Sequence, residues 1–317
     1  MTSLSGLLLA GYSMAPSDPK AEAEFYAGVA ELGVGGLEYA LPLEGSPSLE
    51  PSWVDRNVQP SWDLVVTVVP TLMARLGKDP AYGLGSTDEA SRASALADIG
   101  RARDLAVRLA EQHGRRRVVA IEVHSAPGPL RGSSEALSRS LDEILTWDLG
   151  GAELLVEHCD AHVPGQSAAK GFLTLADEIA AVQAFDVGPE VLGISINWGR
   201  SAIEGRDPAL AVAHTKAVAE AGLLRALIFS GATGTETAWT PAWSDKHIWP
   251  RGDDPALALA ADSLLGPAEM VDTLRAAGAV PRVGLKVAMR PTDASVAMRL
   301  AVAKAALTEI AVAQASL

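Results

Sequence analysis

A single cysteine, Cys159, is present among 317 residues, so an internal disulfide is excluded and the fold must rest on a packed core. No stretch of about 20 apolar residues occurs, which argues against a membrane-spanning helix. The apolar residues 7–9 follow no basic region and are too few, so no signal peptide is expected. These absences predict a cytoplasmic protein without a membrane partner.

Basic residues are also scarce: 26 Lys and Arg stand against 39 Asp and Glu, and the net charge is −13. A nucleic-acid partner is therefore not expected, because binding a polyanion requires basic surface. The chain has no Walker A motif and no G-x-G-x-x-G motif after its first apolar segment, which argues against nucleotide binding. The hydrophobic content of 48% is ample for one large core.

Eight apolar segments alternate with helical segments along the chain. The predicted strands cover 6–12, 35–40, 63–69, 118–124, 153–158, 191–197, 224–230 and 283–289. The predicted helices cover 19–32, 88–113, 133–147, 167–185, 208–222, 267–277 and a final segment from 291, with at most a short helix in 42–61 and a loop over 70–86. We predict an α/β fold, a single (β/α)8 TIM barrel over residues 1–317. A doubly wound open sheet and two smaller α/β units are the alternatives.

A long segment, 231–265, separates the seventh predicted strand from the next helix. It carries three of the seven tryptophans, an acid and a histidine: Trp239, Trp243, Trp249, Asp245 and His247. A long loop of this kind is typical of a lid or an interface, and aromatic faces suit the C–H faces of sugars. Trp198, after the sixth strand, can join them. The alternative is that these rings pack the loop onto the barrel or onto a second subunit, which leaves a homodimer open.

The predicted strands divide into two faces, because successive side chains alternate. In 118–124, Val119, Ile121 and Val123 suit packing under helices, whereas Glu122 and His124 suit a polar lumen. The same parity applied to all strands predicts these polar lumen residues: Glu38, Thr67, Glu122, His124, Glu157, Asn197, Ser230 and Lys286. Polar tips of barrel strands usually form the active site. The alternative is a structural Glu–Lys network that fills the barrel.

Three strand tips resemble those of the xylose isomerase-like TIM barrels, which include sugar isomerases, epimerases and endonuclease IV relatives. The stretches are GLEYAL, VVAIEVHSAPG and LLVEHCDA. The resemblance implies that Glu38 faces substrate and that His124 matches the strand-four histidine. It also implies that Glu157 takes the place of a metal ligand or proton-transfer base. The chain departs enough from the family pattern to be a divergent branch.

The departures fall on the family's divalent metal site. Asn197 and Arg200 stand where the family has Asp-x-x-His, Ser230 stands where it has a histidine, and Lys286 replaces its strand-eight glutamate. Asparagine is a weak ligand, and a protonated lysine cannot bind a cation. The usual ligand set therefore looks dismantled, and Lys286 can act as a fixed positive charge instead. The alternative is a rebuilt metal site of Glu157, Asp245 and His247.

These residues suggest a carbohydrate-active isomerase or epimerase. Glu157 and Glu122 would move a proton at a carbon beside a carbonyl, one as base and one as acid. Lys286, with His124, would stabilise the enolate oxygen. The expected substrate contacts are Glu38, Asn197, Trp198, Arg200, Ser230, Trp239, His247 and Arg290. Ser230 and Arg290 lie where barrels often bind phosphate, so a sugar phosphate is one option.

Two other classes of function remain open from the sequence. One is a lyase or hydrolase of a modified sugar, and the other is a non-catalytic sugar-binding protein with a degenerate metal site. Outside the lumen, His158 has the opposite parity and is predicted to pack or to support the site. His214 lies on a predicted helix and is expected to be structural. Cys159 shows no pattern of a nucleophile.

Overall fold

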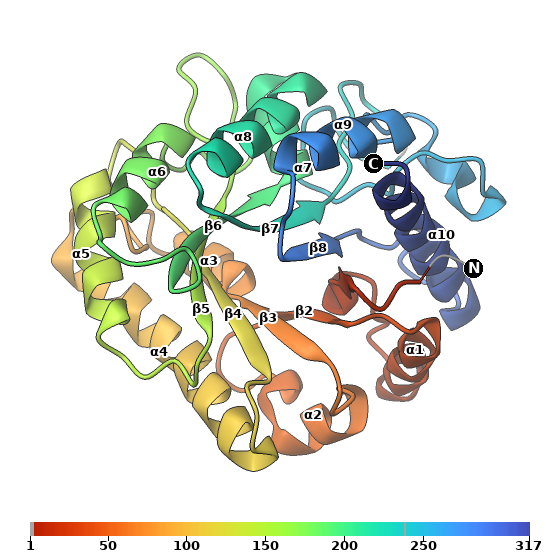
Figure 1. Cartoon of the computed structure of the whole chain (residues 1–317), viewed down its shortest axis with the longest axis horizontal. Helices are drawn as coiled ribbons and strands as arrows, with labels where there is room; N and C mark the ends of the chain where they lie inside the picture. Colours follow the sequence, from red (N-terminus) through yellow and green to blue (C-terminus); the bar gives the residue numbers. More distant parts are fainter. Residues whose placement is uncertain (1–2, 238) are drawn as a thin grey trace.

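The strands lie side by side and close into a parallel barrel (Figure 1). The computed structural model describes residues 3–237 and 239–317, and the strand order around the barrel follows the sequence from β1 to β8. The strands are β1 (Leu7–Leu9), β2 (Gly36–Ala40), β3 (Asp63–Thr67), β4 (Val118–Val123), β5 (Glu153–His158), β6 (Leu192–Asn197), β7 (Leu224–Phe229) and β8 (Arg282–Leu285). The predicted α/β TIM barrel is therefore confirmed.

Helices surround the barrel and cover its outer face (Figure 1). The α-helices are α1 (Pro19–Leu32), α2 (Pro51–Asn57), α3 (Val69–Leu76), α4 (Glu89–His113), α5 (Ser134–Leu145), α6 (Leu175–Gln183), α7 (Trp198–Gly205), α8 (Pro208–Glu220), α9 (Pro267–Ala277) and α10 (Val296–Ala315). Short 3-10 helices are η1 (Gly11–Ser13), η2 (Pro47–Leu49) and η3 (Pro255–Ala260). The sequence did not predict α3 or α7, and α6 begins eight residues later than expected.

The helix ends follow ordinary capping chemistry. Asp18 accepts hydrogen bonds from two backbone N–H groups of the first turn of α1, Pro19 opens that helix, and Gly33 ends it with φ 75°, as predicted. The N-cap of α4 is Asp88, so this helix begins one residue after its predicted start. Its carboxylate accepts a hydrogen bond from the backbone N–H of Ser91, as a serine or threonine hydroxyl would. Its negative charge is also stabilised by the positive end of the helix dipole.

The two unpredicted helices both begin where the sequence suggested a loop. In α3, Pro70 lies in the first turn, where its missing N–H costs nothing, so this proline opens a helix instead of preventing one. In α7, Asn197 ends β6 and also caps the helix, since its side chain accepts a hydrogen bond from Arg200 N. The helix therefore follows the strand directly. This turn holds Arg200 close to the strand tips.

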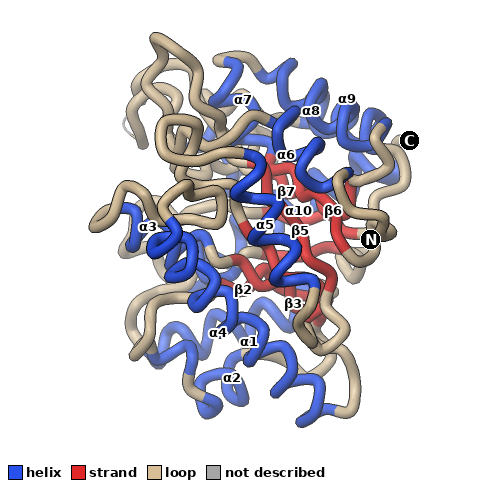
Figure 2. Tube along the Cα trace, turned by 90° about the vertical axis from the view of Figure 1, so that its left-hand side faces the viewer, coloured by secondary structure: helices blue, strands red, loops and turns tan. Residues whose placement is uncertain are grey.

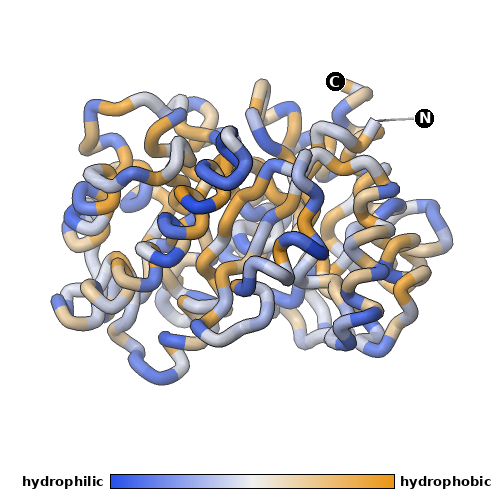
Figure 3. The backbone as a smooth tube through the Cα atoms, turned by 90° about the horizontal axis from the view of Figure 1, so that it is seen from below, coloured by the Kyte–Doolittle hydropathy of each residue, from blue (hydrophilic) through white to orange (hydrophobic). Residues whose placement is uncertain are grey.

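Apolar side chains form a floor inside the barrel, beneath the polar lumen. The floor consists of Leu8, Val65, Val119, Ala120, Leu155 and Ala226, all buried. Val119 was predicted to face the helices, and that prediction is wrong. The pairing of β3 with β4 shifts register between Leu64 and Val65, which moves Val119 to the inner cluster. The hydropathy pattern along the helices, seen in Figure 3, alternates between apolar and polar residues.

The long loops gather on one side of the barrel, together with α3 and α7 (Figure 2). Segment 231–265 is tied to the barrel by an antiparallel bridge between Gly231 and Ile248 and by Trp249, whose Nε1 donates to Ala288 O at 2.8 Å. Trp249 is fully buried, so this ring does pack the loop onto the barrel.

None of the helices in the described ranges has the length and apolar character needed to cross a membrane.

An ion cluster braces the opposite end of the barrel. Glu153, at the start of β5, accepts hydrogen bonds at 3.0 Å from Arg225 of β7 and at 2.8 and 2.6 Å from Arg282 of β8. Burial alone would raise the pKa of Glu153, but the bonds from Arg282 and Arg225 outweigh it and lower the pKa. The carboxylate therefore links three strands in its charged form.

We expect Glu153→Gln to lower the free energy of unfolding by about 2 to 3 kcal/mol at pH 7, because two half-buried arginines lose their charged partner. The folded pKa is depressed, so this stabilisation is present above the ordinary value of 4.5 and is lost as the pH falls below it. Urea unfolding at pH 7 and pH 4 measures both effects. Glu220→Gln, an exposed partner of Lys216, is the control and should change little. Equal stability of Glu153→Gln and the native chain at pH 7 would contradict the expectation.

Candidate active site

Polar side chains fill the barrel above the apolar floor. The residues that strand parity placed there are each no more than 2% exposed: Glu38, Thr67, Glu122, His124, Glu157, Asn197, Ser230 and Lys286. They come from β2 to β8 or from the residues that directly follow those strands. At such burial, charged groups must be paired or neutral, so their partners determine the chemistry of the lumen.

Glu157 is the most highly connected of these groups. His124 Nε2 lies 2.7 Å from Oε2, and Arg200 Nη1 and Asn197 Nδ2 lie 2.6 and 3.3 Å from Oε1. Burial favours a raised pKa, but the charges of Arg200 and Lys286 and the bond from His124 hold the pKa of Glu157 well below its usual range. Burial also lowers the pKa of His124. Glu157 is thus a carboxylate, and His124 is a neutral ring that donates from Nε2.

Lys286 forms a second ion pair across the lumen. Its Nζ lies 2.5 Å from Glu38 Oε1, and the Tyr12 hydroxyl donates to the same oxygen at 3.1 Å. The ammonium also lies 5.6 Å from the centroid of the Tyr12 ring. Burial would lower the pKa of Lys286, yet Glu38 and the neighbouring groups raise it well above its usual value. Lys286 is therefore a fixed positive charge.

Glu122 lacks any such partner. Neither of its carboxyl oxygens has a hydrogen-bond partner among the described residues. Burial and the negative charges of Glu157 and Glu38 raise its pKa well above the usual value. The lumen therefore holds one ionised and one protonated glutamate side by side. Environments that separate two carboxyl pKa values in this way are typical of acid and base pairs in enzymes.

Charged and polar side chains from two loops and from α7 meet above the lumen. We call this group the lid cluster, and it consists of Lys170, Arg200, Asp245 and His247. Asp245 Oδ2 lies 2.9 Å from Lys170 Nζ and 3.2 Å from Arg200 Nε, and Oδ1 lies 3.2 Å from His247 Nδ1. The same ring nitrogen lies 2.7 Å from Ser230 Oγ. Burial lowers the pKa of His247 to about 3. The negative charge of Asp245 raises this pKa, but the positive charges of Lys286 and Arg200 lower it again, so the ring is neutral.

An aromatic cavity of about 390 Å³ opens beside Glu38. Its lining includes Tyr12, Tyr26, Tyr39 and Trp53. The rings of Tyr26 and Tyr39 both meet the Trp53 ring edge-on, with centroids 5.4 and 6.0 Å apart. A carboxylate surrounded by aromatic faces is an arrangement suited to a polyhydroxylated ligand. This cavity reaches a lumen carboxylate from the β1–β2 side.

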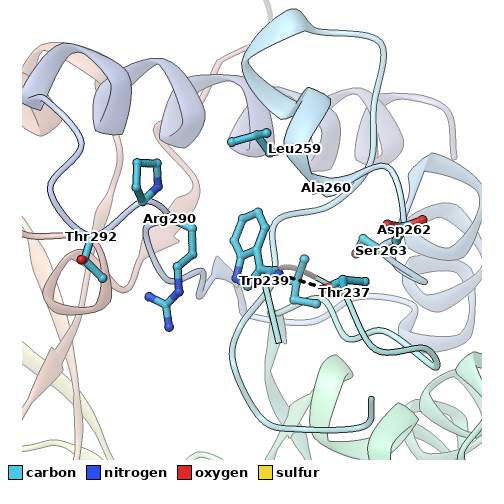
Figure 4. A pocket seen from close by; sticks show the side chains of 10 residues that line it. Thr237, Trp239, Leu259, Ala260, Asp262, Ser263, Arg290 and Thr292 are labelled. Carbon is cyan, nitrogen blue, oxygen red and sulfur yellow. Dashed lines mark hydrogen bonds between the residues drawn. The ribbon is translucent and has the colours of Figure 1, made fainter. Parts of the chain in front are cut away.

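Three predicted contacts lie away from the lumen. Trp198 is fully buried, and its Nε1 donates to Thr273 Oγ1 of α9 at 3.1 Å, so it packs between helices. Trp239 and Arg290 line a separate cavity of about 660 Å³ between the loops after β7 and β8 (Figure 4). Trp239 meets Trp249 edge-on, with ring centroids 4.6 Å apart.

Sequence reasoning missed Tyr12 and Lys170. Tyr12 lies in η1, after β1 ends at Leu9, so strand alternation does not determine the direction of its side chain. Lys170 lies in the loop after β5, where no periodic pattern exists, and only the fold reveals that it meets Asp245. The aromatic cavity was also missed, because its rings come from four separate segments.

The lumen does not fit a divalent metal centre. Arg200 Nη1 already binds one oxygen of Glu157, and Lys286 adds a second buried positive charge that is paired with Glu38. His124, Glu157 and Cys159 bring ligand atoms within 4.8 Å of one another, but the same guanidinium disfavours a second cation there. Asp245 and His247 are not grouped with Glu157 among the metal-like clusters of the described residues, and Asp245 is bound to two cations.

The sequence matches the family model described as "Domain of unknown function (DUF4862)" over residues 8–302. It is also 34% identical over 246 residues to the "Uncharacterized protein STM3670" of Salmonella typhimurium strain LT2, which covers 74% of this chain and 75% of that protein. The match spans most of both proteins.

Solved structures with a similar fold are xylose isomerase-like TIM barrels. A putative xylose isomerase from Rhodospirillum rubrum has a TM-score of 0.65 at 13% identity, over 96% of this chain and 97% of its own. A D-psicose 3-epimerase, crystallised in the presence of D-fructose, has a TM-score of 0.54 at 16% identity, over 90% and 91%. At such identities the comparison establishes the fold, which is the one that the strand tips predicted.

The protonated state of Glu122 yields a stability prediction. Because its folded pKa is raised, the native chain keeps a proton that the unfolded chain releases above about 4.5, so this group destabilises the fold as the pH rises. We expect Glu122→Gln to raise the melting temperature at pH 8, and to raise it less at pH 5. Glu157→Gln is the matched control and should lower it at pH 8, since Arg200 loses a partner. The measurement is the difference in melting temperature between the variant and the native chain at each pH. If Glu122→Gln is less favourable by this difference at pH 8 than at pH 5, Glu122 is ionised in the native chain.

Proposed function

The chain belongs to the family described as the domain of unknown function DUF4862, and we propose that it is a carbohydrate isomerase or epimerase without a lumen metal. The observation that carries this proposal is a pair of buried glutamates with different partners: Arg200 and His124 bind Glu157, whereas Glu122 has no hydrogen-bond partner among the described residues. Both lie beside the ammonium of Lys286, which is paired with Glu38. An enzyme that moves a proton next to a carbonyl needs a base, an acid and a positive group for the oxygen. The fold similarity to sugar isomerase and epimerase barrels supports this general class.

Glu157 and Glu122 divide the proton transfer between them. Glu157, as the carboxylate, accepts the proton from the carbon beside the carbonyl group. Glu122, as the carboxylic acid, donates its own proton to the enolate carbon. After one turnover Glu157 carries the proton and Glu122 is ionised. When the lumen opens and the product leaves, Glu157 releases its proton to water and Glu122 takes one up, which restores the starting state. The closed lumen keeps water away from the enolate.

Lys286 supplies the positive charge that the enolate oxygen needs. Glu38 binds the ammonium, and Tyr12 donates to the same carboxylate oxygen, so the ammonium need not move when charge develops on the enolate oxygen. His124, with its Nε2–H on Glu157, fixes the orientation of the base. Preorganised charges of this kind act strongly where solvent is excluded.

In this proposal the aromatic cavity beside Glu38 binds one end of the substrate. Glu38, Asn197 and Arg200 bind its hydroxyl groups, and the segment 231–265 acts as a lid through Asp245, His247 and Ser230. Lumen residues are at most 2% exposed, so the lid cluster must open before a sugar reaches them. Trp239 and Arg290 border the outer cavity, where a substrate extension or phosphate would lie.

Proton exchange with solvent tests this function without knowledge of the sugar. We expect a panel of aldoses, ketoses and their phosphates, incubated in D2O with the protein, to yield one or more sugars with deuterium beside the carbonyl group. Mass spectrometry and proton NMR detect the label. Glu157→Gln and Glu122→Gln should each reduce its incorporation by about 10²- to 10⁴-fold, the usual contribution of a general acid or base.

Glu153→Gln is the control for that assay, because it changes a buried glutamate at the opposite end of the barrel and should exchange at the native rate below its melting temperature. Binding of a sugar in a thermal-shift panel without exchange would favour a non-catalytic binding protein. Release of a fragment or a dehydrated product would favour the lyase or hydrolase alternative.

Lys286→Met tests the electrostatic role. We expect the exchange rate to fall by about 10²-fold or more, since the enolate loses its fixed charge. The substrate affinity should change less than the rate, because the charge acts mainly in the transition state. Lys170→Met, which removes a positive charge from the lid cluster instead, is the comparison and should alter KM more than kcat. A Lys286→Met enzyme with a native rate would contradict the assigned role.

A further inference from the structure

A second buried cluster lies on the outer side of β5, directly behind Glu157. We call it the outer β5 cluster; its members are His158 of β5, Glu178 of α6, Glu204 of α7 and His214 of α8. The rings of His158 and His214 meet edge-on, with centroids 4.9 Å apart. His158 has no exposed side-chain surface, whereas the side chains of Glu204 and His214 are 13% and 12% exposed. A small ion can therefore reach the cluster from outside the barrel.

Three ligand atoms of this cluster converge on one point. Ligand atoms of His158, Glu204 and His214 all lie within 4.8 Å of one another. His158 Nε2 lies 3.1 Å from Glu204 Oε2, and His214 Nε2 lies 3.7 Å from Glu204 Oε1. Tetrahedral zinc with bonds of about 2.0 to 2.1 Å places its ligand atoms about 3.3 Å apart. Coordination of an ion would thus require the more distant of these atoms to approach one another by up to about 1.5 Å, which side-chain rotation can supply.

The remaining ring nitrogens are already held by other side chains. His158 Nδ1 lies 2.7 Å from Glu178 Oε2, and the other oxygen of Glu178 accepts a hydrogen bond from Ser125 at 2.5 Å. His214 Nδ1 lies 3.1 Å from Ser201 Oγ. A carboxylate or hydroxyl on one imidazole nitrogen leaves the other to face the metal, as in many zinc sites. Both histidines therefore present Nε2 to Glu204.

No lysine or arginine competes for these ligands. In the described part of the chain, the ion pairs of His158, Glu204 and His214 involve only one another and Glu178. The lumen differs, since Arg200 and Lys286 occupy the corresponding space there. Two imidazoles with one carboxylate suit Zn²⁺ and related transition metals, and not Mg²⁺ or Ca²⁺.

We propose that His158, His214 and Glu204 form a Zn²⁺ site that clamps β5, α7 and α8 together behind the lumen. The clamp acts on the proposed active site through α7, which carries Glu204 and also Arg200, a partner of Glu157. It also acts through β5, where Glu157 and His158 are adjacent. The site itself rests on its own geometry and stands whether or not the lumen performs the proposed reaction.

The metal-free alternative is an ion-pair cluster centred on a charged His158. Although burial lowers its pKa, Glu178 and Glu204 raise it to about 10, so an imidazolium between two carboxylates is a self-sufficient arrangement. The two states differ in what they bind, and direct metal measurements distinguish them.

The test uses the full chain, stripped with a chelator and then dialysed against Zn²⁺. We expect one Zn²⁺ per chain by elemental analysis, a melting temperature that rises with Zn²⁺ concentration, and tetrahedral absorption bands with Co²⁺. His214→Gln and Glu204→Gln should each weaken the Zn²⁺ affinity at least tenfold in calorimetric titration. Ser201→Ala, which removes only the support of His214, should weaken it about 10-fold or more while the chain stays folded.

Two control variants locate the ion. Glu157→Gln should keep the stoichiometric Zn²⁺, because its carboxylate belongs to the lumen, and His113→Gln of α4 should keep it because that histidine lies elsewhere. The proposal is overturned if the native chain takes up no Zn²⁺, if His214→Gln and Glu204→Gln bind it with native affinity, or if Glu157→Gln abolishes binding. Loss of deuterium exchange in the lumen variants with Zn²⁺ uptake intact bears only on the proposed function, so the two can fail separately.

Discussion

The balance of charge inside a barrel closed to water is the constraint on which the rest of the site depends. Three acids in or above the lumen are matched by three bases: Glu38 by Lys286, Glu157 by Arg200, and Asp245 by Lys170. Glu122 is the fourth acid and has no base left to pair with. It must therefore keep its proton, and this difference between two neighbouring glutamates follows from the pairing of the others.

Strand parity is the reason that so much of the lumen could be predicted from the sequence. A parallel barrel forces alternate residues inward, so Glu122, Glu157 and Lys286 were placed correctly without any knowledge of their contacts. Parity fails where the pairing shifts, as at Val119, and it says nothing about loops. Lys170 and Asp245 lie 75 residues apart in loops of no fixed period, so only the folded chain brings them together.

The two faces of β5 carry different chemistry on adjacent residues. Glu157 points inward to Arg200, and His158 points outward to Glu178 and Glu204. Helix α7 joins these environments, because Arg200 and Glu204 lie one turn apart on it and reach opposite sides of the strand. Any displacement of α7 is thus felt by both clusters, and the strand between them keeps their charges apart.

The bonds of Asp245 also determine how the entrance moves. One carboxylate on the segment 231–265 binds Lys170 from the loop after β5 and Arg200 from the helix after β6. Neither loop can swing outward alone without breaking this shared contact. The shared carboxylate therefore couples the two loops, and Asp245 is the residue through which a displacement of one loop is passed to the other.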